Sequence, residues 1–247
     1  MQVRNFNIDD SFLVRTSGTS DGTQDKFFKD GLWFKLDRYG GEGIAETAAS
    51  IILEESDFDS SKFVAYTPCL INGKHGCYSK NFLGEDESFI TIYRLYKNVY
   101  GKDLAQACSK MDYDDAIEYV ISFVKQQIGL DIREYLANTF MLDKIILNED
   151  RHFNNLGVIF NGKYFKTAPI FDNGKSFLIG NKRALEKDSL QEKIKCAYAK
   201  SFSPSFATNA KYLEKYCTLK IDVNCIQSIE KLGNEGITEI LRYTLGI

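Results

Sequence analysis

Three polar side chains in the middle of the sequence have the types and spacing that phosphoryl transfer needs. Asp150 precedes Asn155 by five residues, and Asp172 follows after a short segment that we expect to form a hairpin. A carboxylate can accept the proton of an acceptor hydroxyl, and carboxylate and amide oxygens can bind Mg²⁺ beside nucleotide phosphates. These residue types make Asp150 a candidate catalytic carboxylate, and Asn155 and Asp172 candidate magnesium ligands.

Residues nearer the N-terminus could bind the nucleotide. Lys35 lies in a predicted strand, 32–37, and Glu46 lies eleven residues later in a predicted helix, 43–55. Small residues on the same side of this helix would let Glu46 approach the lysine of the strand. Gly22 and Thr23 precede the strand and could offer backbone N–H groups to phosphate oxygens. We therefore expect these four residues to contribute to ATP binding.

Two differently patterned parts of the chain must position these side chains. Residues 1–84 alternate in the manner of strands around one helix, whereas residues 85–247 carry helical periodicity. The clearest predicted helices are 113–128, 131–147, 185–199, 207–217 and 234–245. The pattern predicts an α+β protein with a small β-rich N-lobe (1–84) and a helical C-lobe (85–247), the nucleotide lying between them.

Composition and charge narrow the class of protein. The 247 residues are 44% hydrophobic and 26% charged, as in an ordinary globular protein, and the net charge of −3 gives no basis for a nucleic-acid surface. The N-terminal residues lack the apolar segment of a signal peptide, and no apolar run has the length of a membrane helix. We therefore expect a cytoplasmic protein that binds neither nucleic acid directly nor a membrane.

Four short segments, in order, resemble the HipA-like serine/threonine kinases, an atypical branch of the protein-kinase-like fold. They are "DGTQDK" (21–26), "FKLD" (34–37), "NEDRHFNN" (148–155) and "APIFDNG" (168–174). The resemblance implies a two-lobed kinase-like fold and transfer of phosphate from ATP, with Mg²⁺, to serine or threonine on a protein. It also implies that Asp150 is the catalytic aspartate, that Asn155 and Asp172 bind magnesium, and that Lys35 contacts the nucleotide phosphates.

The resemblance has consequences for regulation as well. HipA-like kinases are associated with autophosphorylation in the phosphate loop, where Ser17, Thr19 and Ser20 are the candidate acceptors. A phosphate there adds negative charge near the ATP phosphates and should inhibit. The family also suggests the toxin of a toxin–antitoxin system, whose antitoxin would be a separate chain. The order Asp-Arg-His reverses the common kinase His-Arg-Asp, so the role of Arg151 cannot be transferred from conventional kinases.

Other interpretations of the same residues stay open at this point. Asp150 and Asn155 could cap turns, Lys35 could be a solvated strand lysine, and His152 is expected to be a structural hydrogen-bonding residue. The chain could be a nucleotide-binding pseudokinase that acts as an interaction module, or a lipid or small-molecule kinase of the same fold. A metal-dependent phosphohydrolase would need more ligands than the two histidines of the chain readily provide.

Overall fold

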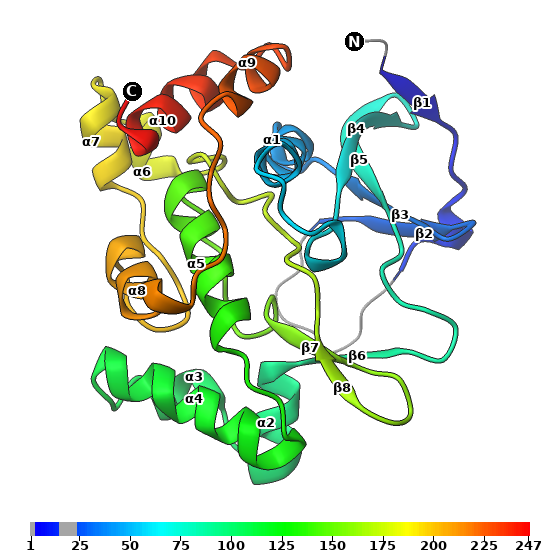
Figure 1. The fold of residues 1–247 in the computed structure, drawn as a ribbon. Coiled ribbons are helices and arrows are strands. Elements are labelled where there is room, and N and C mark those ends of the chain that lie inside the picture. Colours follow the sequence, from blue (N-terminus) through cyan, green and yellow to red (C-terminus); the bar gives the residue numbers. More distant parts are fainter. Residues whose placement is uncertain (1–2, 15–23) are drawn as a thin grey trace.

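The computed structural model describes residues 3–14 and 24–247, and it combines a sheet-rich part with a larger helical part (Figure 1). The strands are β1 (Arg4–Phe6), β2 (Lys26–Lys29), β3 (Leu32–Leu36), β4 (Tyr66–Ile71), β5 (Lys74–Lys80), β6 (Ser88–Thr91), β7 (Gly157–Phe160) and β8 (Phe165–Thr167). The α-helices are α1 (Glu42–Glu55), α2 (Ile92–Tyr100), α3 (Leu104–Cys108), α4 (Tyr113–Ile128), α5 (Arg133–Ile146), α6 (Lys182–Leu185), α7 (Leu190–Lys195), α8 (Phe206–Tyr212), α9 (Cys225–Glu230) and α10 (Glu235–Leu245). Short 3₁₀ turns cover Asp10–Phe12, Ser60–Lys62 and Glu214–Tyr216.

The five-stranded sheet, in the order β1-β4-β5-β3-β2, presents Lys35 on one face. In the antiparallel register, Lys35 of β3 lies opposite Lys26 of β2 and Cys77 of β5. The neighbouring residue Phe34 points to the other face, where it joins an apolar cluster with Phe27 and partly buried rings. One face of the sheet is therefore closed by its own side chains, and the lysines are on the other.

Helix α1 lies close against the lysine-bearing part of the sheet. Asp37 accepts hydrogen bonds from the backbone N–H groups of Gly41 and Gly43, each at 2.7 Å, and so fixes the start of the helix. A Cβ atom at Gly43 would lie 2.6 Å from the backbone of Gly76 in β5. Only glycine permits this approach, which brings Glu46, one turn later, to the side chain of Lys35.

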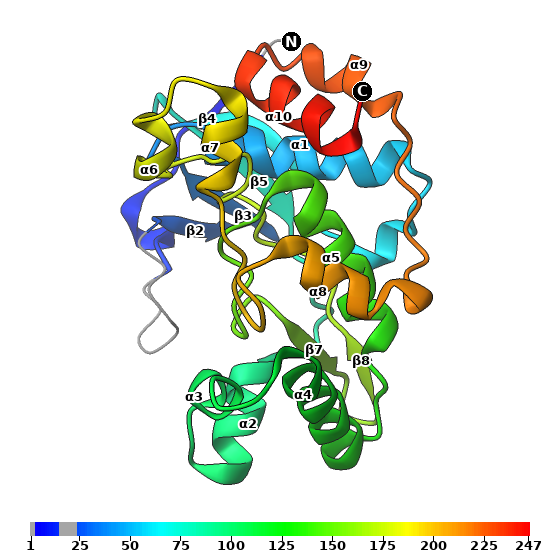
Figure 2. The same ribbon diagram turned by 90° about the vertical axis from the view of Figure 1, so that its left-hand side faces the viewer.

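The opposite side of α1 packs against the C-terminal helices. Both views show α9 beside α1 (Figures 1 and 2), and the two helices are in contact, while α10 packs on α9 and α5. The backbone N–H of Asp222 donates a hydrogen bond to Ser56 Oγ at 3.0 Å, just beyond the end of α1. Ala45, Ala49 and Ile229 of these elements belong to the main hydrophobic core. Helix α1 is thus held from two sides.

The helical part agrees with the predicted helices in some places and differs in others. Helices α4 and α10 match the predictions, and α5 is one to two residues shorter at each end. The predicted helix 185–199 is wrong, because Ser189 and Glu192 form a capping box that starts α7 after a break from α6. The predicted helix 207–217 is divided in the structure: α8 ends at Tyr212, and a 3₁₀ turn follows over Glu214–Tyr216.

A second sheet, in the order β6-β7-β8, lies below the first one in Figure 1. Strands β7 and β8 form the hairpin expected between Asn155 and Asp172, and β6 pairs antiparallel with β7. Strand β6 was not predicted, because its four residues follow a polar linker. Within residues 3–14 and 24–247, no helix combines the length and the apolar character that crossing a membrane requires.

Candidate functional site

Lys35, itself buried, is the centre of an ionic cluster that joins β3, α1 and the segment after β8. Its Nζ lies 2.6 Å from Glu46 Oε1 and 2.8 Å from Asp172 Oδ1. The second lysine of that sheet face, Lys26, places its Nζ 3.8 Å from Asp172 Oδ2. Glu46 also accepts a hydrogen bond from the backbone N–H of Asn173 at 2.8 Å. The structure thus brings together Lys35, Glu46 and Asp172 as one group.

The charges in this cluster support one another. Burial alone would raise the pKa of Asp172, but Lys26 and Lys35 outweigh it and hold that pKa well below its usual range. Burial would lower the pKa of Lys35, but Asp172 and Glu46 raise it well above its usual value. Burial raises the pKa of Glu46 against the opposing effect of Lys35. Asp172 is therefore an anion and Lys35 a cation at neutral pH.

Asp150 and Asn155 are held by hydrogen bonds within their own loop. The side-chain amide of Asn155 donates to the backbone carbonyl of Asp150 at 2.9 Å, which accounts for their separation of five residues. The backbone N–H of Asp150 donates to Asn148 Oδ1 at 3.0 Å, so the loop is fixed at both ends. The first of these bonds uses the amide nitrogen of Asn155, and the amide oxygen has no hydrogen bond among the described residues. The side chain of Asp150 is 33% exposed.

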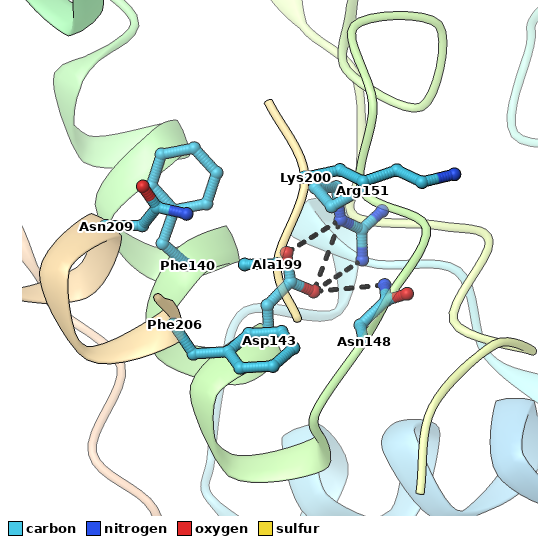
Figure 3. A pocket seen from close by; sticks show the side chains of 8 residues that line it. All are labelled: Phe140, Asp143, Asn148, Arg151, Ala199, Lys200, Phe206 and Asn209. Atoms are coloured by element: carbon cyan, nitrogen blue, oxygen red, sulfur yellow. Dashed lines mark hydrogen bonds and ion pairs between the residues drawn. The ribbon is translucent and has the colours of Figure 1, made fainter. Parts of the chain in front are cut away.

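Arg151 connects this loop to the segment that carries Asp172. Its guanidinium is buried and bonds to both carboxylate oxygens of Asp143, at 3.0 to 3.3 Å, as Figure 3 shows. It also donates to Asn173 Oδ1 at 2.5 Å and to the backbone carbonyls of Asn155 and Phe171. The space around these groups is too small for a water molecule. Arg151 therefore has a structural role, because it holds the loop of Asp150 and the segment of Asp172 together from their buried side.

The sequence contained a signal for this role. Asp143 is a single acid within the apolar helical run "TFMLDKIIL" (139–147), and it lies eight residues before Arg151. A carboxylate on a buried helix face needs a cationic partner, and the nearest cation on the following loop is Arg151. Burial raises the pKa of Asp143, and Arg151 opposes that rise.

Lys200 is a further charged residue at the site that the sequence did not indicate. Its ammonium forms an ion pair with Asp150 Oδ1, although the two residues are fifty positions apart. His152 Nε2 lies 3.8 Å from the other oxygen of Asp150. Burial lowers the pKa of His152, although Asp150 acts in the opposite direction, so the imidazole is neutral at pH 7.

The phosphohydrolase alternative and a separate hollow in the molecule can be compared with this geometry. In the described residues, no three His, Cys, Asp or Glu side chains come together as metal ligands, so a phosphohydrolase centre on Asp150, His152 and Asp172 lacks its ligand set. A hollow of about 870 Å³ lies between the start of β4, the linker at Asn81 and β8, and none of the predicted site residues lines it.

The remaining predicted residues lie outside the described part of the chain. Gly22 and Thr23, expected to bind the nucleotide phosphates, are in the segment 15–23, which the structure does not describe. The same holds for the candidate autophosphorylation residues Ser17, Thr19 and Ser20. These expectations stay predictions.

Comparison with known proteins supports the fold. Neither a protein-family model nor the sequence of a curated protein matches the chain. The crystal structure of the Helicobacter pylori proinflammatory kinase CtkA matches with a TM-score of 0.63 and 17% identity, over 97% of this chain and 93% of that one. A HipA–HipB toxin–antitoxin complex with operator DNA from Shewanella oneidensis MR-1 has a TM-score of 0.46 and 8% identity, over 93% of this chain and 65% of that one, and adds nothing further. The chain therefore has the two-lobed, kinase-like fold that its sequence predicts.

Proposed function

We propose that this protein is an ATP- and Mg²⁺-dependent phosphotransferase. The observation that carries the proposal is the pairing of Lys35 with both Glu46 and Asp172, residues that lie eleven and 137 positions away. A lysine that is charged, buried and shared between a helix carboxylate and a loop carboxylate is the arrangement that phosphoryl transfer uses to bind nucleotide phosphates. Arg151 connects that cluster to the loop of Asp150 and Asn155.

The residues present fit a magnesium ion. Mg²⁺ in nucleotide sites takes one or two protein oxygens and completes its shell with phosphates and water. The ionised carboxylate of Asp172 and the amide oxygen of Asn155 would supply those protein ligands. When bound, the ion neutralises charge on the phosphates. Lys35 would bind phosphate oxygens, and Asp150 would orient the acceptor hydroxyl and take its proton.

The acceptor is proposed from the sequence resemblance. HipA-like kinases act on serine or threonine hydroxyls of proteins, and we propose the same class here, with autophosphorylation among Ser17, Thr19 and Ser20. A lipid or small-molecule acceptor is the alternative within the same fold. A toxin role with a separate antitoxin chain also stays a proposal. CtkA, which has this fold, is a proinflammatory kinase, and this supports the proposal of kinase activity here.

Incubation with γ-labelled ATP and Mg²⁺, alone and with host lysate, tests the proposal. The wild type should transfer label to protein, and mass spectrometry should identify the labelled residues. Asp172→Ala should lose transfer and Mg²⁺-dependent ATP binding. Asp150→Asn should keep ATP binding but transfer about 10²–10⁴-fold more slowly, because it lacks the positioned proton acceptor.

Asp188→Ala is the matched control, because this aspartate is exposed and lies outside the site. It should behave as the wild type does. ATP binding without any turnover in the wild type would instead support the pseudokinase alternative. Near-normal transfer by Asp150→Asn or Asp172→Ala would reject the assignment of those residues.

A further inference from the structure

Lys200 lies in a loop that is fixed firmly against the catalytic loop. Phe202 packs edge-to-face on Phe140 of α5 and on Phe153, with ring centroids 5.8 and 5.2 Å apart. The backbone N–H of Ala199 donates to the carbonyl of Pro204 at 2.8 Å, which closes the loop on itself. The position of Lys200 is therefore set by the fold and not by its ion pair with Asp150 alone.

The backbone of Ser201, the residue after Lys200, is strained. Its φ of 81° is in the left-handed region, which a serine rarely adopts, and its hydroxyl donates to the backbone carbonyl of Arg151. A strained residue of this kind persists only where the surrounding structure holds it, and such residues concentrate at functional sites. The strained residue directly follows Lys200 and ties its loop to the residue after Asp150.

The ion pair of Lys200 with Asp150 should contribute little to the stability of the fold. The two side chains of the Lys200–Asp150 pair are 38% and 33% exposed, and exposed ion pairs add little to the free energy of unfolding. Figure 3 shows the Lys200 side chain extending away from the buried contact between Arg151 and Asp143, with its ammonium group at the far end. The ammonium group thus lies beside Asp150 and outside the buried hydrogen bonds between Arg151 and Asp143.

The carboxylate of Asp150 has Lys200 as its ion-pair partner, while the other cations around the proposed reacting centre pair elsewhere. Lys26 and Lys35 balance Glu46 and Asp172 on the nucleotide side. His152, the other basic residue in contact with Asp150, is neutral at pH 7 because burial lowers its pKa. Among the described residues, Lys200 is thus the charged partner of Asp150, and without it this carboxylate would face an anionic phosphoryl group unpaired.

We propose that Lys200 is a further catalytic residue, which binds the transferred phosphoryl group on the acceptor side. This inference rests on the proposed function. The acceptor oxygen forms a bond to the γ-phosphorus, the bond from that phosphorus to the β–γ bridging oxygen breaks, and its electron pair stays on ADP. The acceptor proton passes to Asp150. Lys200 keeps its proton throughout and stabilises the negative charge of the phosphoryl oxygens.

Lys200→Met tests the role, because it keeps most of the stem and removes the charge. The probe is Mg²⁺-ATP with water as the acceptor, followed as inorganic phosphate released, together with self-transfer of γ-label. We expect kcat to fall about 10²-fold while the KM for ATP stays within about threefold, as for loss of one transition-state contact. Lys200→Arg should restore at least about a tenth of the activity, because it keeps the charge.

Lys195→Met is the matched control, since Lys195 is an exposed lysine at the end of α7. It should leave kcat unchanged. Lys200→Gln provides a second neutral variant, and thermal denaturation confirms that each variant is folded. A neutral variant with the kcat of the wild type, or a higher one, would overturn the role of Lys200 while the proposed function stood. A folded wild type that neither binds Mg²⁺-ATP nor releases phosphate would overturn both.

Discussion

Two ionic clusters meet at residues 172 and 173, and they differ in access to solvent. The open cluster consists of Lys26, Lys35, Glu46 and Asp172, and the sealed cluster consists of Asp143, Asn148, Arg151 and Asn173. In the open cluster Lys26 and Asp172 are 31% and 24% exposed, whereas Arg151 and Asp143 in the sealed cluster are 2% and 5% exposed. Similar groups therefore differ in accessibility: the open cluster can be reached from solvent, whereas the sealed cluster is closed within the fold.

The pKa shifts follow the same division. Two lysines hold the pKa of Asp172 well below its usual range despite burial, whereas burial raises the pKa of Asp143 despite Arg151. Asn173 belongs to both clusters, since its backbone N–H donates to Glu46 and its side chain accepts from Arg151. The open cluster is therefore positioned by the sealed one. Mutations in the two clusters should affect different measurable quantities.

The largest expected effect is loss of stability in the sealed cluster. Arg151→Met should lower the free energy of unfolding by about 3–5 kcal/mol, because it leaves a buried carboxylate without its partner. Urea denaturation measures the change. Arg133→Met is the control, because its ion pairs with Glu118 and Asp131 are at the surface, and it should cost no more than about 1 kcal/mol. Equal losses in the two variants would contradict the comparison.

In the open cluster the main expected change is a loss of activity. Lys35→Met should lower phosphoryl transfer about 10²-fold, because the variant keeps the packing of the stem and removes the charge that binds phosphate. Lys26→Met should have the smaller effect, since its contact with Asp172 is longer. The two variants are compared in kinase assays at equal thermal stability. A larger loss in Lys26→Met would make Lys26 the main phosphate contact.

The smallest expected effect concerns acid stability. The pKa of Asp172 lies below its usual range in the folded protein, whereas the same carboxyl group in the unfolded chain should have a pKa of about 3.9. The stabilising contribution of Asp172 is therefore present above about pH 4 and is lost as the pH falls below it. Wild-type unfolding free energy should decrease more steeply between about pH 5 and pH 3 than that of Asp172→Asn. Parallel curves from urea denaturation would reject the shift.

The sequence predicts the parts of the site that depend on local spacing. Asn155 closes back on the carbonyl of Asp150, so their separation is a property of one loop. Strand alternation and helix periodicity place Lys35 and Glu46 on facing sides, which is why that pair could be anticipated from residues 32–55. Asp172 was found through its motif, and its contact with Lys35 spans 137 residues.

What the sequence does not predict depends on tertiary contacts or on competing local signals. Lys200 reaches Asp150 because Phe202 packs between two aromatic rings, and no periodicity marks that contact. The break between α6 and α7 follows from a capping box inside an apparently continuous helical pattern, and Leu185 is 80% exposed there. The packing of α9 on α1 joins residues from opposite ends of the chain.

That packing of α9 on α1 restricts how the protein could be switched on and off. An outward swing of α1 would separate Glu46 from Lys35, and it would first have to break the contact with α9 and the hydrogen bond between Asp222 and Ser56. The cost would include exposure of Ala45, Ala49 and Ile229, which are fully buried. The Lys35–Glu46 pair is therefore supported by packing on the far side of α1 as well as by its own contact. A switch that acts by swinging α1 would therefore have to undo this packing first, so control of activity is expected to act elsewhere than on the orientation of α1.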